Sequence, residues 1–349
     1  MVNTVVVGLG RSGQGAARLL RATGHRVAVI DSGQSEQIEQ KAEGLRQQGV
    51  EVQLQAPLAI DSFRPWLDQL QRVVISPGIP WDHPTLEDLR QRDVAVDGEM
   101  AVAWDALKHI PWVGITGTNG KTTVTHLLSH VLCQAGLAAP MGGNMGVSAA
   151  EMALTLQQEQ TCAPDWLVME LSSYQIEAAD RIRPRIGIWT TLTPDHLERH
   201  GTVEAYRAIK RGLLERSDHA IFNADDPDLR QQRQSWTGGT WVSAESARPD
   251  GQPADLWING EGWVCDQSQP LFPAEALAMP GSHNRQNLLL VTAAALQIGL
   301  SPASIEAGLR SFPGVPHRLE PLGRIRNAQV FNDSKATNYD AAAVGLKAM

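Results

Sequence analysis

The sequence predicts an α/β protein built on parallel sheets. Short runs rich in β-branched residues alternate with helical patterns along most of the 349 residues. Two glycine-rich segments, at 8–13 and 114–123, each stand between a predicted strand and a predicted helix. Hydrophobic residues make up 42% of the chain and charged residues 19%, which is enough apolar content for more than one core.

Three units are predicted along the chain. Strands expected at 4–7, 26–30, 50–54, 72–75 and 94–96 define a first domain over residues 1–106. A second series, at 112–115, 166–169, 186–191 and 220–222, opens a central domain that covers residues 107–315. A strand-like run at 329–331 belongs to a third unit, residues 316–349.

The second half of the central domain has a different pattern. Residues 236–271 form short β-like pieces separated by Gly, Pro and Asp, and we expect an antiparallel or irregular insertion there. Two helices follow. The first covers 283–298 and ends before Gly299, and the second begins at Ser301-Pro302, with proline in its first turn.

Composition excludes several classes of protein. The net charge of −8 argues against a general nucleic-acid binder. Cys133, Cys162 and Cys265 form no CxxC pair, which indicates a reducing compartment and argues against a disulfide framework. The chain opens without the basic region of a signal peptide, and its longest apolar stretch, 288–300, is too short to span a bilayer. We therefore expect a cytoplasmic protein that binds no nucleic acid and does not insert into membranes.

The first glycine-rich segment, GLGRSG at 8–13, predicts a Rossmann-like nucleotide-binding domain. Its glycines allow a tight turn, and they let backbone N–H groups approach a phosphate. Asp31 closes the next strand, where a ribose hydroxyl or a base edge would bind. The pattern does not identify the nucleotide as NAD, and glycines that only allow tight packing of a helix on a strand remain an alternative.

The second segment, GITGTNGKTT at 114–123, predicts a central P-loop ATPase-type α/β domain. In such a loop the backbone N–H groups cradle phosphates, the lysine reaches the outer phosphates, and the next hydroxyl binds Mg²⁺. Lys121 and Thr122 hold these two positions. The strict pattern requires glycine where Ile115 stands, so the loop is a variant.

Further segments make the chain resemble the muramyl ligase family over essentially its whole length. Besides GTNGKTT at 117–123, they are SPGIP (76–80), GGNMG (142–146), MELSSYQIE (169–177), TPDHLERH (193–200), YRAIK (206–210), GSHNRQN (281–287), PHRLE (316–320) and NDSKATN (332–338). The early GLGRSG, SPGIP and NDSKATN resemble the branch that adds D-glutamate. The resemblance implies ATP-dependent ligation of D-glutamate to UDP-N-acetylmuramoyl-L-alanine through an acyl phosphate, in peptidoglycan precursor synthesis.

The resemblance also implies an ATP site and two Mg²⁺ ions. Lys121, His196 and Lys210 are the implied catalytic residues. Thr122 and Glu170 would hold the first Mg²⁺, and His196 with a carbamylated Lys210 the second. The implied ATP contacts are Gly117, Thr118, Asn119, Gly120, Lys121, Thr122, Thr123, Asn284, Asn287, Arg318, Asp333 and Lys335.

Three of these positions have plainer interpretations from the residues alone. Lys210 would lie on a solvated face of the helix at 203–216, and Asn284 would cap a helix. Glu170 would be a solvated carboxylate at the end of a strand. The spacing of His196 and His200 suggests zinc, but the pattern is not HExxH and no third ligand is evident. We assign His200 to the solvent.

For the precursor, the resemblance replaces NAD with a uridine nucleotide. The implied contacts are Arg11, Ser12, Asp31, Ser32, Gly78, Asn144, His196 and Thr337. The family's third domain is a complete Rossmann-like unit, so residues 316–349 would be only its beginning, and a chain ending there is expected to ligate poorly. We expect a monomer whose partners are the small-molecule substrates.

Two other classes of protein share part of the pattern. A nicotinamide dehydrogenase would leave the loop at 117–123 unexplained. A P-loop ATPase or switch module would leave GLGRSG and NDSKATN unexplained. Two phosphate loops in one chain favour a ligase.

Overall fold

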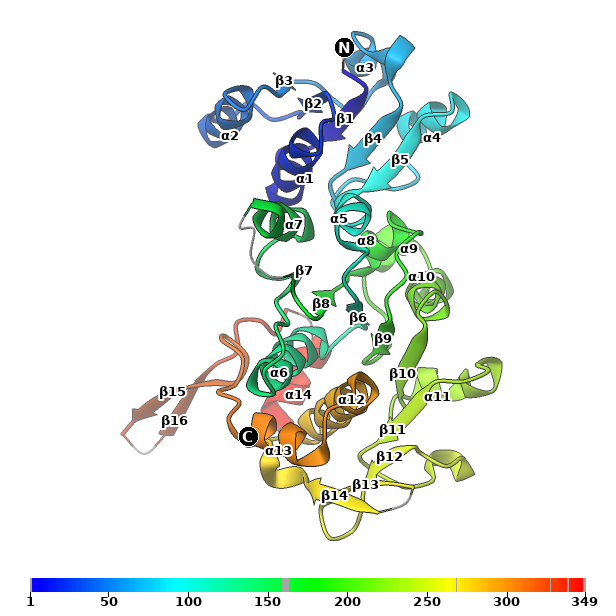
Figure 1. The fold of residues 1–349 in the computed structure, drawn as a ribbon, viewed down its shortest axis with the longest axis vertical. Coiled ribbons are helices and arrows are strands. Elements are labelled where there is room, and N and C mark those ends of the chain that lie inside the picture. Colours follow the sequence, from blue (N-terminus) through cyan, green and yellow to red (C-terminus); the bar gives the residue numbers. More distant parts are fainter. Residues whose placement is uncertain (1, 159–162, 268, 327, 338, 348–349) are drawn as a thin grey trace.

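The computed structural model describes residues 2–158, 163–267, 269–326, 328–337 and 339–347, so Cys162 and Asn338 lie outside it. Within these ranges the strands form three sheets, ordered β3-β2-β1-β4-β5, β14-β13-β12-β11-β10-β9-β6-β8-β7 and β15-β16. The five-stranded sheet lies at one end of an elongated molecule, the nine-stranded sheet extends from the middle to the other end, and the β15–β16 hairpin projects from the side (Figure 1).

The first unit is a parallel sheet between two layers of helices. All five strands lie within one or two residues of the expected positions, so the predicted α/β fold is confirmed here. The strands are β1 (Thr4–Val7), β2 (Val27–Ile30), β3 (Glu51–Gln53), β4 (Arg72–Ile75) and β5 (Ala95–Gly98). One face is covered by α1 (Arg11–Ala22), α2 (Glu36–Arg46) and α5 (Glu99–Leu107), and the other by α3 (Ile60–Phe63) and α4 (Pro84–Gln91).

The central sheet is parallel through its first seven strands. These are β6 (Trp112–Thr116), β7 (Met141–Gly143), β8 (Leu167–Glu170), β9 (Ile186–Trp189), β10 (His219–Asn223), β11 (Thr240–Ser243) and β12 (Leu256–Ile258). β13 (Trp263–Asp266) runs antiparallel to β12, and β14 (Pro270–Pro273) pairs antiparallel with β13. The antiparallel character expected at 236–271 is confirmed for β13 and β14, but a separate insertion is wrong, because β11 and β12 continue the parallel sheet and all four strands extend it. These strands are three or four residues long, which is too short to show a periodic pattern.

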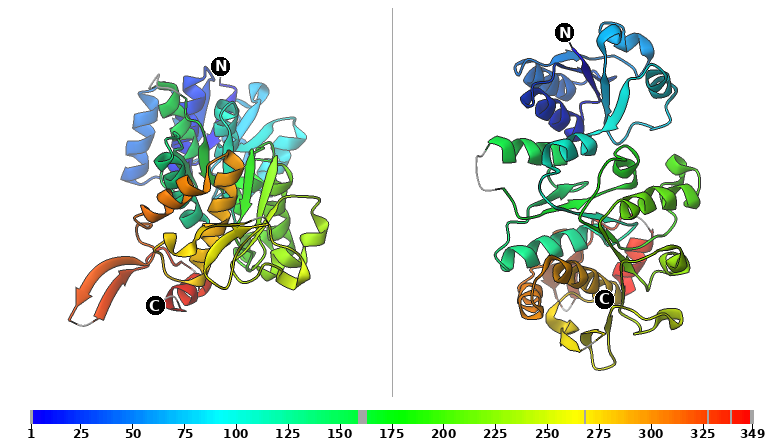
Figure 2. Two further views of the ribbon diagram at one scale, coloured as in Figure 1. Left: turned by 60° about the horizontal axis from the view of Figure 1, so that its bottom comes forward. Right: turned by 45° about the vertical axis from the view of Figure 1, so that its right-hand side comes forward.

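Helices cover both faces of the central sheet (Figure 2). One face carries α6 (Lys121–Gln134), α12 (Ser282–Ile298) and α13 (Pro302–Arg310), and the other carries α7 (Ala149–Gln158), α8 (Ser173–Glu177), α10 (Val203–Glu215) and α11 (Pro227–Gln231). Gly299 ends α12 with a φ of 107°, and the Ser301 hydroxyl accepts the Ser304 N–H at the start of α13. Both helix signals read from the sequence are confirmed.

One hydrophobic core joins the first unit to the central sheet. It runs from Val6 and Val29 through α1, α5 and α7 to Trp112 and Met169, all of which are buried. Trp104 on α5 packs edge-on against Trp112, with ring centroids 5.1 Å apart. Since burial of apolar surface is the main favourable term in folding, this shared core fixes the two units relative to each other.

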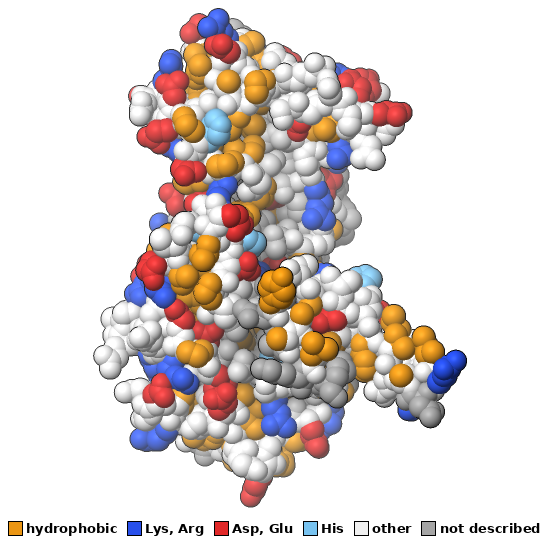
Figure 3. All heavy atoms as spheres, turned by 180° about the vertical axis from the view of Figure 1, so that it is seen from behind, with side chains coloured by type: hydrophobic (Ala, Val, Ile, Leu, Met, Phe, Trp, Pro, Cys, Tyr) orange, Lys and Arg blue, Asp and Glu red, His pale blue; other side chains and the backbone are white. Residues whose placement is uncertain are grey.

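The third unit consists of a hairpin and a helix. β15 (Glu320–Ile325) pairs antiparallel with β16 (Ala328–Asn332), and α14 (Tyr339–Lys347) follows. Leu322 is 61% exposed and Ile325 68% exposed, and Figure 3 shows hydrophobic side chains along the projecting hairpin. The strand expected at 329–331 is present, while the domain boundaries stay predictions. No helix in the described ranges is both long enough and apolar enough to cross a membrane.

Candidate active site

The segment that follows β9 holds the P-loop in shape. The Thr190 hydroxyl donates to the Asn119 carbonyl at 2.5 Å, and the Thr191 hydroxyl accepts the Asn119 N–H at 2.9 Å. The Thr118 N–H donates to the Thr191 carbonyl at 2.8 Å. Gly117 has a φ of 147°, and a Cβ there would lie 1.9 Å from the Thr190 hydroxyl oxygen, so only glycine fits.

Lys121 opens α6 with its ammonium group turned back into the loop. Its Nζ donates to the carbonyl oxygens of Gly117 and Thr118, at 2.9 and 2.8 Å. Burial lowers the pKa of Lys121, and the carboxylates of Glu170 and Asp195 oppose that shift. The amine therefore lies inside the loop, and its contact with the outer phosphates of a nucleotide stays a prediction.

Glu170 ends β8 beside the loop, and both of its carboxylate oxygens have partners. Oε2 accepts from the Thr122 hydroxyl at 2.9 Å, and Oε1 accepts from Asn144 Nδ2 at 3.0 Å. The residue is only 2% exposed, so the interpretation as a solvated strand-end carboxylate is wrong. A carboxylate, a hydroxyl and an amide in contact supply the hard oxygen ligands that Mg²⁺ requires.

Lys210 is 1% exposed, so the solvated position expected from the residues alone is wrong. It lies on the inner face of α10, and its Nζ donates to the Gly117 carbonyl at 2.9 Å and to the Thr116 hydroxyl at 3.4 Å. The ammonium nitrogen also sits 4.5 Å from the centroid of the Tyr206 ring. Burial, with Lys121 nearby, lowers the pKa of Lys210 well below its usual value.

The two histidines of TPDHLERH differ in environment. His196 precedes α9 (Leu197–His200) with a φ of 53°, and its ring, 5.1 Å from that of Tyr174, is partly exposed. The His200 side chain is 0% exposed and makes a 2.9 Å hydrogen bond with Ser173, so its expected place in solvent is wrong. Burial lowers the pKa of His200 to about 4. In the described part of the chain no three His, Cys, Asp or Glu side chains are grouped to hold a metal.

One cleft of about 530 Å³, the phosphate cleft, joins the P-loop to the first unit and to the third. It brings together most of the residues implied for phosphate, metal and precursor. Lys210 is not among the lining residues, since it lies behind the loop. The lining residues are Arg11, Thr118, Asn119, Gly120, Lys121, Thr122, Asn144, Met145, Gly146, Glu170, Asp195, His196, Arg318, Ser334, Lys335 and Thr337.

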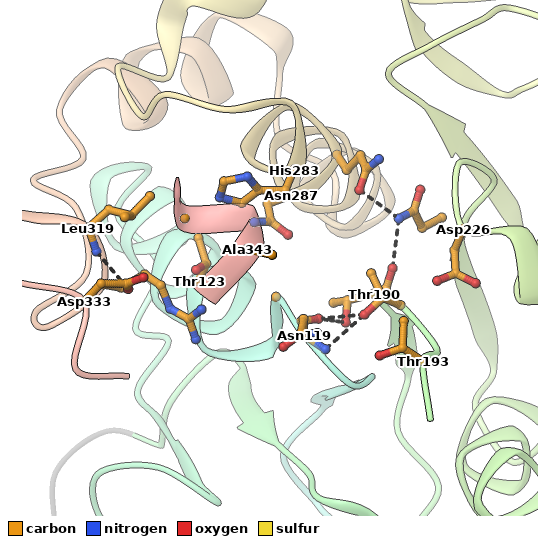
Figure 4. Close-up of a pocket in the computed structure, with 16 residues that line it drawn as sticks. Asn119, Thr123, Thr190, Thr193, Asp226, His283, Asn287, Leu319, Asp333 and Ala343 are labelled. Carbon is orange, nitrogen blue, oxygen red and sulfur yellow. Dashed lines mark hydrogen bonds between the residues drawn. The ribbon is translucent and has the colours of Figure 1, made fainter. Parts of the chain in front are cut away.

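A second cavity of about 340 Å³, the base pocket, opens on the other side of the loop (Figure 4). Asn119, Gly120 and Arg318 line both cavities. Asn287 lines the base pocket, and its Nδ2 donates to Asn284 Oδ1 at 3.1 Å. Asn284 in turn donates to the Pro280 carbonyl at 2.6 Å, outside the pocket. Gly281 is the N-cap of α12, so Asn284 is not the cap but fixes Asn287.

The sequence reasoning missed several residues of the two cavities. His283 and Gln286 line the base pocket from one side of α12, and the motif GSHNRQN contains both, so helical spacing from Asn287 could have found them. Asp195 in the phosphate cleft stands inside TPDHLERH. Thr190 and Asn223 had no local signal, because they reach the site only through the pairing of β9, β10 and β6.

In the first unit, Asp31 supports the glycine loop directly. Its carboxylate oxygens accept the Leu9 N–H at 2.6 Å and the Gly33 N–H at 2.7 Å. The other residues implied for the precursor, Ser12, Ser32 and Gly78, lie outside the lining of the phosphate cleft. A Cβ on Gly13 would lie 1.9 Å from the Gly8 carbonyl, so tight packing accounts for Gly13.

Arg11 is the residue of the glycine loop that reaches the central unit. Its Nη1 donates to the Gly146 carbonyl at 2.7 Å, and Arg11 lines the phosphate cleft. The two predicted phosphate loops therefore both contribute to one cavity, the first through Arg11 alone.

Comparisons of the sequence identify two domain families. Residues 115–295 match the Mur ligase middle domain, and residues 2–98 match the Mur ligase MurD-like N-terminal domain. Among curated relatives, UDP-N-acetylmuramoylalanine--D-glutamate ligase of Parasynechococcus marenigrum (strain WH8102) is 93% identical over the whole chain, which covers 76% of that protein. The protein of the same name from Synechococcus sp. (strain CC9605) is 67% identical with the same coverage.

Solved structures share the fold at lower identity. A murein peptide ligase of Psychrobacter arcticus matches with a TM-score of 0.60 and 21% identity, covering 99% of this chain and 75% of that one. A UDP-N-acetylmuramate-alanine ligase of Thermotoga maritima matches with a TM-score of 0.59 and 22% identity, covering 100% and 77%. In both, the match extends over the first unit and the central sheet alike.

Proposed function

The chain belongs to the Mur ligase family, and from that premise we propose how its two cavities share one reaction. The enzyme uses ATP to add D-glutamate to UDP-N-acetylmuramoyl-L-alanine in the synthesis of peptidoglycan precursors. A carboxylate is a poor electrophile, so its oxygen first attacks the γ-phosphorus of ATP, giving an acyl phosphate and ADP. The amine of D-glutamate then attacks the carbonyl carbon, loses a proton, and displaces inorganic phosphate.

The single observation that carries this proposal is the phosphate cleft. Arg11 of the glycine loop and Lys121 of the P-loop line the same cavity, although their helices, α1 and α6, belong to different units. A ligase has to bring the carboxyl end of one nucleotide-linked substrate to the γ-phosphate of a second nucleotide. We propose that the uridine nucleotide binds on the first unit, near Arg11, Ser12, Asp31, Ser32 and Gly78, and extends into this cleft.

ATP would bind across the P-loop, with its base and its phosphates on opposite sides. The adenine lies in the base pocket against Asn287, which Asn284 keeps in place. The triphosphate follows residues 117–123 into the phosphate cleft, where Lys121 exchanges its two carbonyl partners for phosphate oxygens. Because phosphoryl transfer asks mainly for positioning and charge neutralisation, the preformed loop supplies most of what this step needs.

The first Mg²⁺ would be held by Glu170 and Thr122, whose contact at 2.9 Å already forms an oxygen site. Bound there, the ion would neutralise charge on the phosphates. Asn144, on the other oxygen of Glu170, keeps that carboxylate oriented and faces the precursor.

The second Mg²⁺ is proposed at His196 and a carbamylated Lys210. The lowered pKa of Lys210 supports the modification, because the neutral amine is the form that attacks CO₂ and releases a proton. The carbamate would supply oxygen ligands that a lysine lacks. In the unmodified side chain Nζ is turned to the Gly117 carbonyl, so modification requires the chain end to rotate toward the cleft.

The third unit would close over ATP. Arg318 lines both cavities, Asp333 lines the base pocket, and Lys335 and Thr337 line the phosphate cleft. The Leu319 N–H donates to Asp333 Oδ1 at 3.2 Å, which orients that carboxylate. Closure of such a segment excludes water and completes the charge balance around the phosphates. We place the reaction in the cytoplasm and propose that the chain acts as a monomer.

The test is transfer of D-[¹⁴C]glutamate to UDP-N-acetylmuramoyl-L-alanine with ATP and Mg²⁺, by a protein of the relatives' full length, of which this chain covers 76%. Product should require all four components, and L-glutamate should not replace the D-isomer. Calorimetry should show binding of the precursor and no binding of NAD⁺. Tight NAD⁺ binding, or ATP hydrolysis that needs no acceptor and yields no radioactive product, would contradict the proposal.

A further inference from the structure

Hydrogen bonds and one short backbone segment, residues 144–146, connect the glycine loop of the first unit to the P-loop. This set begins at Arg11, the first residue of α1, whose Nη1 donates to the Gly146 carbonyl at 2.7 Å. These residues are 135 positions apart in sequence and belong to different units. A side chain expected at the phosphates of the uridine nucleotide thus also holds a backbone group of the central unit.

Gly146 belongs to a tight loop that carries Asn144. The Gly143 N–H donates to the Val147 carbonyl at 3.1 Å, which closes the loop around residues 144–146. Asn144 attaches this loop to the end of β8 twice, because its N–H donates to the Glu170 carbonyl at 2.9 Å and its Nδ2 to Glu170 Oε1 at 3.0 Å. A shift of the Gly146 carbonyl therefore moves the group that orients Glu170.

The set ends at the P-loop itself. The Thr122 hydroxyl donates to the remaining oxygen of Glu170 at 2.9 Å. The five residues of this set line the phosphate cleft: Arg11, Gly146, Asn144, Glu170 and Thr122. Under the proposed function, Arg11 at one end would contact the uridine nucleotide and Thr122 at the other the magnesium nucleotide. Short polar contacts between two ligand sites are the kind of physical connection through which binding at one can change affinity at the other.

The backbone at Arg11 is held in place by the packing of α1 on α7. A movement of the guanidinium group is therefore passed on to the Gly146 carbonyl and not absorbed by the helix. Glu99 at the start of α5 accepts the Ala150 N–H of α7 at 2.6 Å, and Ala16 of α1 is buried in one core with Ala149 and Ala153 of α7. A Cβ on Gly15 would lie 2.7 Å from the Ser148 hydroxyl oxygen, so α1 and the start of α7 are nearly in backbone contact. The two helices cannot slide without breaking these contacts.

A guanidinium group has five N–H donors in a planar fork, and the Gly146 carbonyl takes one of them. Phosphate oxygens of the uridine nucleotide can take others at the same time. A phosphate that immobilises the guanidinium then also immobilises the Gly146 carbonyl, and through Asn144 it keeps Glu170 ready for a magnesium nucleotide.

Resting on the proposed function, we propose that Arg11 couples the two nucleotide sites, so that the uridine precursor and Mg²⁺-ATP bind with positive cooperativity. Arg11 acts on the ATP site as a positioning residue, through Gly146 and Asn144. Because coupling between binding sites is reciprocal, each ligand raises the affinity of the other by the same factor. In the absence of precursor, the Arg11–Gly146 contact already favours the ATP site.

Calorimetry with Mg²⁺-AMP-PNP and UDP-N-acetylmuramoyl-L-alanine, each alone and with the other saturating, tests the coupling. For the native chain we expect each ligand to bind about fivefold more tightly, or better, when the other is saturating. Arg11→Lys keeps the charge but offers one nitrogen in place of a fork, so the coupling should fall below about twofold. The same variant should bind Mg²⁺-AMP-PNP alone about three to ten times more weakly, which a residue that only holds the precursor would not cause.

Arg18→Gln is the matched control, because Arg18 leaves the same helix for the same α7 segment but does not contact residues 142–146. Arg18→Gln should change neither the coupling factor nor the affinity for Mg²⁺-AMP-PNP alone by more than about 1.5-fold. Gly146→Val keeps Arg11, but at a φ of 61° a β-branched residue strains the backbone and shifts the carbonyl, so it should also weaken the coupling. Native-like coupling in Arg11→Lys, or an equal loss in Arg18→Gln, overturns the inference. Absence of precursor binding by the native chain would instead contradict the proposed function.

Discussion

Replacing Glu170 by glutamine separates charge from shape at the first magnesium site. The glutamine carbonyl can accept from Asn144, as Oε1 does at 3.0 Å, and its amide can donate to the Thr122 hydroxyl, which also accepts. Two charge-assisted hydrogen bonds become neutral ones, while a buried charge disappears. We therefore expect the free energy of unfolding to change by no more than about 2 kcal/mol.

The affinity for a magnesium nucleotide should fall much further. Loss of residues that only support a metal ligand lowers metal affinity by about 10- to 100-fold. A carboxylate that contacts the ion directly should cost at least about 100-fold, which corresponds to about 2.7 kcal/mol. The loss of nucleotide affinity should shrink as the Mg²⁺ concentration is raised, because the missing carboxylate would bind the ion and not the nucleotide.

Calorimetric Kd values for AMP-PNP at several Mg²⁺ concentrations measure this loss. Glu177→Gln is the control, since Glu177 pairs with Arg199 at 2.9 Å and lines neither cavity. It should leave nucleotide affinity unchanged. A loss below about fivefold in Glu170→Gln, with the Mg²⁺ dependence unaltered, would remove Glu170 from the magnesium site.

Three further predictions concern buried ionisable groups. Lys121→Ala should abolish ATP-dependent phosphate release while precursor affinity stays nearly intact; retention of more than about a tenth of native turnover, a loss under about 1.4 kcal/mol, would contradict its role. Lys210→Ala, in a protein with a complete third domain, should be inactive and should recover partly with added acetate or formate, which can replace the oxygens of a carbamate; near-normal activity with no response would return Lys210 to a structural role. Burial raises the pKa of Glu99 from 4.5 to about 7, so the folded chain keeps a proton that the unfolded chain releases between these values. This contribution to stability is complete below pH 4.5 and is lost as pH rises through 7. In urea titrations Glu99→Gln should therefore lose less stability than the native chain between pH 5 and pH 8, and parallel curves would refute the assignment.

The sequence predicted those parts of the fold that leave a local pattern. Strands made mostly of apolar residues were predicted correctly at β1, β4 and β6, because burial on both faces makes such runs nearly continuous. β11 and β12 were misjudged as an insertion. Their place in the sheet depends on pairing with β10, and pairing over long distances leaves no trace in a four-residue run.

The residues of the site also divide into those that the sequence places correctly and those that it does not. Lys121, Thr122 and Glu170 follow from loop chemistry and from the end of a strand, where ligands of open sheets bind. Lys210 and His200 could not be placed from spacing alone, because a lone Lys or His on a helix is usually solvated. Both are buried because α10 and α8 pack on the back of the P-loop, which sequence periodicity does not reveal.

The bracing of the P-loop by Thr190 and Thr191 limits how far this motif can be transplanted. Its backbone shape is imposed by residues about 70 positions later, at the end of a neighbouring strand. A peptide spanning only β6 and α6 contains every residue of the motif but none of these braces. Exchange of this loop between homologous enzymes should therefore succeed only when the segment after β9 is exchanged with it.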